Sequence, residues 1–186
     1  MTQTTMKGPR FIPTAASENT METRNSFDLR TTGARATDAS RLQPHPDHAD
    51  SGLYVLWLQI PRPVRTAAGS LGSFVLAPGL YAYIGTAQRR RSARIARHLK
   101  PEKPLRWHID YIRPHANIVA VSLVDGTRDG ECRLARLLAQ TLDARIAVRR
   151  FGASDCRCPG HLLLCPSGTS LDRVERLALG QLVRLA

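Results

Sequence analysis

No stretch of the sequence approaches the roughly 18 consecutive apolar residues that a membrane-spanning helix requires, so we expect no membrane partner. The N-terminal residues also lack the apolar segment of a secretory signal. Cysteine is scarce: the chain has four, all at or after Cys132, and this placement is unlike a secreted disulfide framework. These absences predict a cytoplasmic protein whose thiols are reduced.

Acidic side chains are few as well, with 15 Asp and Glu against 27 Lys and Arg, which gives a net charge of +12. Residues 1–50 contain six basic and six acidic side chains, so the excess lies entirely in residues 51–186. Such an excess attracts polyanions, and nucleic acid, expected to be DNA, is the predicted partner. A solvated surface on a generally Arg-rich protein is the alternative. The predicted nucleic-acid-binding residues are Arg89, Arg90, Arg91, Arg97, Lys100, Lys103 and Arg106.

The apolar content of 42% in 186 residues allows one domain with a sizeable core. Residues 1–48 show no repeating apolar face and are predicted to be a disordered tail, followed by a domain over 51–167. The fold class we expect is α/β (α+β), with a small central mixed or antiparallel sheet flanked by helices. The pattern predicts strands at 52–60, 71–77, 80–85, 117–125 and 145–150, an extended segment at 161–164, and helices at 92–99, 107–113, 130–142 and 170–185, the last being amphipathic and packed on the domain.

The stretch 79–99 combines three features that suit a phosphodiester site. A strand carrying Tyr83 leads into a turn of small residues, where a ligand backbone can approach closely. The helix that follows has Ser92 as its expected cap and presents Arg94 and His98 four residues apart on one face. The plain alternative is a strand and helix with a solvated basic surface.

Glu131 is the best-placed carboxylate for a metal ion. In the helix predicted over 130–142 it shares a face with Ala135, Leu138 and Leu142, and that face packs inward. A carboxylate on an inward face is costly unless it is paired or binds a cation. The alternative is an acid at a helix N-terminus, where negative charge favours the dipole.

Two tripeptides, Gly52-Leu53-Tyr54 and Tyr83-Ile84-Gly85, resemble the paired signature of the GIY-YIG nuclease superfamily, and Arg94, Ile95 and His98 resemble its arginine-and-histidine helix. Two later stretches, Trp107–Tyr111 and Phe151–Cys158 followed by His161-Leu162, resemble a small uncharacterised branch found alone or fused to DNA-repair glycosylases. The resemblance covers about residues 51–165. About 28 residues separate Tyr54 from Tyr83, where the superfamily has a short hairpin, so the pairing of the two tyrosine strands is left open.

The resemblance implies a metal-dependent endonuclease that hydrolyses DNA phosphodiester bonds in repair or genome maintenance. It implies a Mg²⁺ or Mn²⁺ ion held by Glu131. A non-catalytic nucleic-acid-binding module with a degenerate nuclease site is the alternative. The implied catalytic residues are Tyr54, Tyr83, Arg94, His98 and Glu131, with Tyr81, His108, Asp110 and Asp155 as accessory residues.

The segment Cys156-x-Cys158-x2-His161-x3-Cys165 contains the ligand types of a zinc site. Its first two cysteines are closer together than the usual structural spacing of two to four intervening residues. We therefore favour reduced structural thiols, with a zinc-stabilised interaction domain as the alternative hypothesis.

Overall fold

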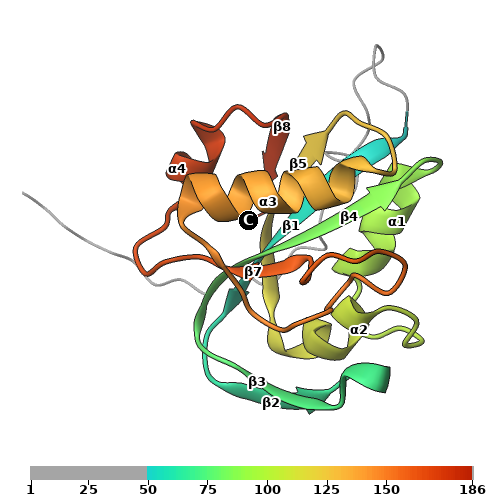
Figure 1. Ribbon diagram of the computed structural model, residues 1–186, viewed down its shortest axis with the longest axis vertical. Helices are drawn as coiled ribbons and strands as arrows, with labels where there is room; N and C mark the ends of the chain where they lie inside the picture. The colour runs from blue at the N-terminus through green and yellow to red at the C-terminus, as the bar shows by residue number, and fades with distance from the viewer. Residues whose placement is uncertain (1–49, 186) are drawn as a thin grey trace, which may run out of the picture. The chain divides into compact units, whose positions relative to one another are not determined.

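The computed structural model describes residues 50–185, so the tail predicted over 1–48 lies outside the described residues. Within them a six-stranded sheet has the order β6-β7-β4-β1-β5-β8, and every neighbouring pair is antiparallel (Figure 1). The predicted α+β fold with an antiparallel sheet and flanking helices is confirmed. The elements are β1 Gly52–Ile60, β2 Val64–Ala67, β3 Ser73–Leu76, β4 Gly79–Ala87, α1 Arg91–Leu99, α2 His108–Ile112, β5 Asn117–Val124, α3 Gly130–Leu142, β6 Arg145–Ile146, β7 Leu162–Leu164, α4 Leu171–Glu175 and β8 Gln181–Arg184.

Strand β1 lies near the middle of the sheet and is apolar on both faces. Tyr54, Leu56 and Leu58 belong to the core that the sheet shares with α1 and α2. Val55 and Trp57 belong to the second core, beneath α3 and α4. The alternation follows from the two-residue period of a strand, and it separates the two layers of helices.

The two tyrosine strands pair along their whole length despite the long connection between them. Strands β1 and β4 run antiparallel, with Tyr54 opposite Gly85 and Leu56 opposite Tyr83. The extra residues form a separate two-stranded sheet of β2 and β3, joined to the far end of this pair. Strand β2 was not predicted, because Pro61 and Pro63 directly precede this strand of only four residues.

The helix predicted over 170–185 is wrong. Helix α4 ends at Glu175, and β8 pairs with β5 at the edge of the sheet. Ala178 and Gly180 have φ values of 49° and 140°, which no continuing α-helix allows. A Cβ on Gly180 would also collide with the carbonyl oxygen of Leu123, so glycine permits the close approach of the two chains.

Smaller differences concern single residues. Leu137 of α3 is 45% exposed, whereas its neighbour Leu138 is fully buried. Ser92 was expected to cap α1, but the side chain of Asp50 does so. Its carboxylate accepts hydrogen bonds from the backbone N–H and the hydroxyl of Ser92, both at 2.8 Å. The strand predicted over 145–150 is only the two residues of β6.

Among residues 50–185, none of the helices combines the length and the apolar character needed to cross a membrane.

Candidate active site

The ring of Tyr54 lies directly over Gly85 of the neighbouring strand. A Cβ on Gly85 would fall inside contact distance of the Tyr54 ring and hydroxyl, so only glycine leaves room for this side chain. Tyr54 is 2% exposed, and its hydroxyl reaches α1. The second glycine of the paired signature is therefore explained by packing against the first tyrosine.

His98 on α1 contacts both tyrosines. Its Nε2 lies 3.0 Å from the hydroxyl oxygen of Tyr54, within hydrogen-bonding distance. The ring of Tyr83 meets it edge-on, with ring centroids 6.1 Å apart. Burial, followed by the positive charge of Lys103, lowers the pKa of His98 to about 3, so the imidazole is neutral.

Both tyrosines are neutral too. Burial raises the pKa of Tyr54, and the nearby guanidinium of Arg94 acts in the opposite direction. Burial also raises the pKa of Tyr83, followed by the effects of Tyr54 and Glu131. Tyr54, Tyr83, Arg94 and Glu131 are thus close enough to influence one another electrostatically.

Two contacts hold the side chain of Arg94, which projects from α1. Its Nη1 donates to the carbonyl oxygen of Thr86 at 2.9 Å. Its guanidinium carbon lies 5.0 Å from the centroid of the Trp107 ring, and that of Arg97 lies 4.3 Å from the same ring. Trp107 is half-buried and supports both arginines.

Glu131 lies in the first turn of α3, and its side chain is 22% exposed. Burial, followed by the negative charge of Asp155, raises the pKa of Glu131 to about 7. The backbone N–H of Thr86 and the charge of Arg94 act in the other direction. A carboxylate in this setting is the group that a bound cation would stabilise in its charged form.

Four further residues were expected beside the site. Tyr81 instead donates its hydroxyl to the carbonyl oxygen of Ala77 at 2.7 Å. His108 accepts at Nδ1 a hydrogen bond from the backbone N–H of Gly152, at 3.0 Å.

The side chain of Asp155 is 75% exposed and forms an ion pair with Arg128. It acts on Glu131 through its negative charge.

Asp110, the fourth, is the centre of a buried ion-pair network. It accepts from Arg97 at 3.0 Å, lies 3.3 Å from Lys103, and accepts from the backbone N–H groups of Arg106 and Trp107. Burial alone would raise the pKa of Asp110, but these hydrogen bonds and charges together lower it. Asp110 therefore joins α2 to α1 rather than facing a ligand.

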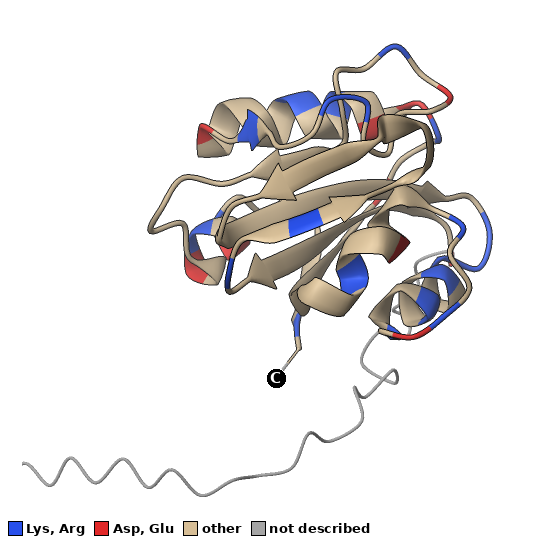
Figure 2. Cartoon of the chain, turned by 90° about the horizontal axis from the view of Figure 1, so that it is seen from below, with Lys and Arg blue, Asp and Glu red and all other residues tan. Residues whose placement is uncertain are grey.

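The predicted nucleic-acid-binding residues divide into two groups. Arg91 is buried and donates to the carbonyl oxygens of Leu53 and Val124, so its charge serves the fold. Arg97 and Lys103 are bound to Asp110. In Figure 2 most charged positions lie on helices and loops, and the strands are largely uncharged. The exposed members of the basic group are Arg89, Arg90, Lys100 and Arg106.

The cysteines are arranged differently from the sequence prediction. Cys165 is buried, and its backbone N–H donates to Leu80, away from the other cysteines. Its place beside Cys156, Cys158 and His161 is taken by Cys132 of α3, and the four possible ligand atoms lie within 4.8 Å of one another. Cys132 and Cys158 form a disulfide, whereas we expected reduced thiols throughout.

A cavity of about 720 Å³ opens at the other end of β4, between Gln59, Gly79 and Cys165. None of the five predicted catalytic residues lines it. We therefore do not place the reaction there.

A family model described as "Domain of unknown function DUF123" matches residues 53–182. No curated protein and no solved structure matches the chain.

His98 should make the stability of the protein depend on pH. The unfolded histidine has a pKa near 6.5 and the folded one about 3, so between these values the unfolded chain binds one more proton. The neutral His98 contributes fully to the free energy of unfolding above about pH 6.5. Between about pH 6.5 and pH 3 this contribution is lost as the pH falls, by about 1.4 kcal/mol per pH unit. Asp110 favours the imidazolium, but Lys103, Arg97 and Arg94 oppose it.

Chemical denaturation of the wild type and of His98→Gln between pH 4 and 7 measures this contribution. The difference in slope between the two should be about 1.4 kcal/mol per pH unit. His115→Gln removes an exposed histidine and should keep the wild-type slope. Equal slopes for wild type and His98→Gln would show that His98 is protonated in the folded chain.

Proposed function

The chain belongs to the family of the domain of unknown function DUF123, and we propose that it is a metal-dependent endonuclease of the GIY-YIG type. Its reaction would be hydrolysis of DNA phosphodiester bonds, in repair or genome maintenance. The observation that carries the proposal is the hydrogen bond between Tyr54 and His98, with Tyr83 packed against the same imidazole. Arg94 and Glu131 act electrostatically on the Tyr54 hydroxyl at the same place.

Arg94 would bind the scissile phosphate. A guanidinium carries five N–H donors and is always charged, and the contact with Thr86 uses one nitrogen. Stacking on Trp107 limits its movement, so the remaining donors are directed before substrate arrives. Negative charge on the phosphoryl oxygens increases toward the transition state, and a fixed cation stabilises it there.

Tyr54 would orient the attacking water. In the tautomer of His98 whose Nε2 is unprotonated, the Tyr54 hydroxyl donates to that nitrogen and its own oxygen keeps lone pairs for water. His98 acts as a positioning residue, because its low pKa makes it a poor store for a proton. Tyr54 keeps its own proton and stays neutral, so it would orient the water without taking a proton from it. The proton of the water would pass to solvent, and the positive charge of Arg94 would favour the hydroxide that remains.

Glu131 fits the metal that such a reaction requires. It is a partly buried carboxylate whose pKa is raised by burial and by a neighbouring acid, and a divalent cation would remove both penalties. Mg²⁺ is commonly held by one or two carboxylates, waters and substrate phosphate oxygens. When bound, Mg²⁺ or Mn²⁺ would supply charge neutralisation on the phosphoryl oxygens and help for the leaving alkoxide.

A second candidate is a nucleic-acid-binding module without cleavage. The observation that favours it is the burial of Tyr54 and Tyr83, which are 2% and 7% exposed. In that case the basic surface beside α1 would remain functional and the hydroxyl groups would serve packing alone.

Removal of a single hydroxyl separates the two candidates. Tyr54→Phe should lower the Mg²⁺-dependent cleavage rate by about 10²-fold, because the attacking water loses the hydroxyl that positions it. Tyr83→Phe should also lower the rate. Tyr81→Phe, on the same strand as Tyr83 but bonded to Ala77, is the matched control and should cleave normally. The assay uses plain, nicked and branched DNA duplexes. If the wild type cleaves none of them while binding DNA, the second candidate is correct.

Glu131→Gln should abolish cleavage and leave DNA binding intact or slightly tighter. Gln keeps the shape of the side chain but loses the charge that holds a hard cation and repels phosphate. Arg94→Ala should weaken both binding and cleavage, because a guanidinium contacts the phosphate before and during the reaction. Normal Mg²⁺-dependent cleavage by Glu131→Gln would remove Glu131 from the proposed metal site.

Salt dependence identifies the surface that binds DNA. Neutralising the exposed Arg89 and Arg90 to Gln should reduce the slope of log affinity against log salt by up to about 0.9 for each lost phosphate contact. The control is Arg173→Gln with Arg176→Gln, an equal charge change at α4, far from α1 in Figure 1. An unchanged slope in the Arg89 and Arg90 variant would place the DNA elsewhere.

A further inference from the structure

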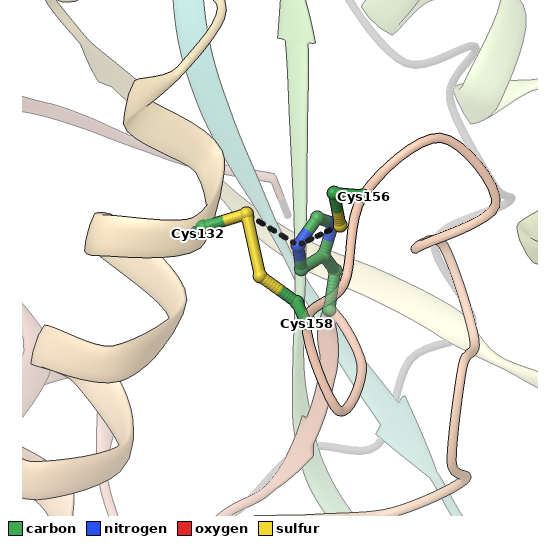
Figure 3. Close-up of side chains that lie close together, drawn as sticks. Cys132, Cys156 and Cys158 are labelled. Atoms are coloured by element: carbon green, nitrogen blue, oxygen red, sulfur yellow. Dashed lines mark hydrogen bonds between the residues drawn. A yellow bond between two sulfur atoms is a disulfide. The ribbon is translucent and has the colours of Figure 1, made fainter.

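Four potential metal ligands converge beside the first turn of α3. Cys132 comes from that turn, while Cys156, Cys158 and His161 come from the loop and turn that precede β7 (Figure 3). The Nε2 of His161 lies 3.7 Å from the sulfur of Cys132 and 3.7 Å from the sulfur of Cys156. His161 is 1% exposed, so this ring is fixed among the sulfurs.

The disulfide between Cys132 and Cys158 accounts for only half of this arrangement. A structural disulfide has no need of a third thiol, yet Cys156 lies at the same point. It has no need of an imidazole either, yet a ring nitrogen is directed at two sulfurs. A single tetrahedral cation would use all four side chains.

We propose that the reduced chain binds one Zn²⁺ through the sulfurs of Cys132, Cys156 and Cys158 and the Nε2 of His161. Bonds of about 2.3 Å to sulfur and 2.0 Å to nitrogen in a tetrahedron put nitrogen and sulfur about 3.5 Å apart. The two nitrogen-to-sulfur distances are close to that value. Reduced Cys132 and Cys158 would move apart to about 3.8 Å, the sulfur–sulfur distance of the same tetrahedron.

The surroundings suit three thiolates. Cys132 lies at the N-terminal end of α3, a helix of 13 residues, where the helix dipole favours negative charge. Arg150 donates through Nη1 to the carbonyl oxygens of Cys156 and Cys158. Its cation therefore shapes the loop and offsets the negative charge of the sulfurs.

The other nitrogen of His161 lies close to a carboxylate, the kind of group that often accepts the second N–H of a metal-binding histidine. Its Nδ1 is buried without a hydrogen-bond partner in the described chain, and the Oε2 of Glu131 lies 3.6 Å from it. A proton on Nδ1 directed at a carboxylate leaves Nε2 free to bind metal and fixes the ring. A small shift of Glu131 would complete this hydrogen bond.

The reduced and oxidised forms differ by two electrons. The Cys132–Cys158 disulfide accepts two electrons and two protons from a dithiol reductant, which becomes a disulfide itself. Zn²⁺ then displaces the protons of the three thiols, which are released to water. The metal would tie the turn that carries Glu131 to the loop whose Phe151 packs on Tyr83, at 6.0 Å between ring centroids.

Metal content of the full-length chain, purified under a thiol-free phosphine reductant, tests the proposal. The wild type should contain about one Zn²⁺ per chain. Cys156→Ser removes one of the four ligands and should contain clearly less zinc per chain than the wild type, although it leaves both cysteines of the disulfide in place. Cys165→Ala removes the cysteine outside the cluster and should keep the wild-type zinc content.

Titration of the metal-free, reduced wild type with Co²⁺ gives a second measurement that needs no variant. We expect the visible bands of tetrahedral Co²⁺ together with thiolate charge-transfer absorption, both removed by one equivalent of Zn²⁺. Failure of the reduced wild type to bind either metal would overturn the proposal, as would equal loss of zinc in Cys156→Ser and Cys165→Ala. Tyr54→Phe should keep its zinc, so loss of DNA cleavage and loss of zinc are separate results.

Discussion

The antiparallel pairing of β1 with β4 is the constraint on which the candidate site depends. It sets Tyr54 opposite Gly85 and Leu56 opposite Tyr83, so the two tyrosine side chains lie on the same face of adjacent strands. Both then meet α1, where His98 lies between them. A shift of the register by one residue would turn Tyr54 toward α3 and leave the imidazole without its hydrogen bond.

Buried charge holds α1 against this pair of strands. Arg91 at the start of the helix donates to backbone carbonyls of β1 and β5, and Arg97 near its end binds Asp110. A buried cation is costly unless it is paired, so each of these contacts is demanding on geometry. The basic character of this region therefore has two origins: part of it orients the helix, and part of it is exposed.

Much of the fold could be predicted from the sequence, because the signals were local. The alternation in β1, the tyrosine strand and the apolar face of α3 were each visible within a dozen residues. The prediction for the C-terminal segment failed because Leu171, Val174 and Ala178 recur at helical spacing, whereas strand pairing with β5 decides the structure after Gly180. Propensity was overridden there by tertiary contact.

The part of the candidate site that could be predicted is the part whose residues match the spacing of the family motif. Tyr54, Tyr83, Arg94 and His98 came from motif resemblance, and the structure brings them together with Glu131. Neither the buried role of Arg91 nor the position of Cys132 had a local signal. Cys132 is 24 residues from Cys156 along the chain, and only the path of α3 over the sheet brings the two together.

The hairpin of β2 and β3 leaves the β1–β4 pair where β1 ends, at Ile60, and where β4 begins, at Gly79. Ile60 is six residues along β1 from Tyr54. At about 3.3 Å per residue this distance is roughly 20 Å. The two strands of the hairpin still reach the site by side-chain packing, because Phe74 of β3 packs on Phe151, at 5.9 Å between ring centroids, and Phe151 packs on Tyr83. The turn between the two strands is different: Gly69 and Ser70 are exposed, and a Cβ on Gly69 would meet no atom within 4 Å. An affinity tag, a fluorophore or a second binding module could therefore be inserted at this turn, while the strands of the hairpin keep their packing.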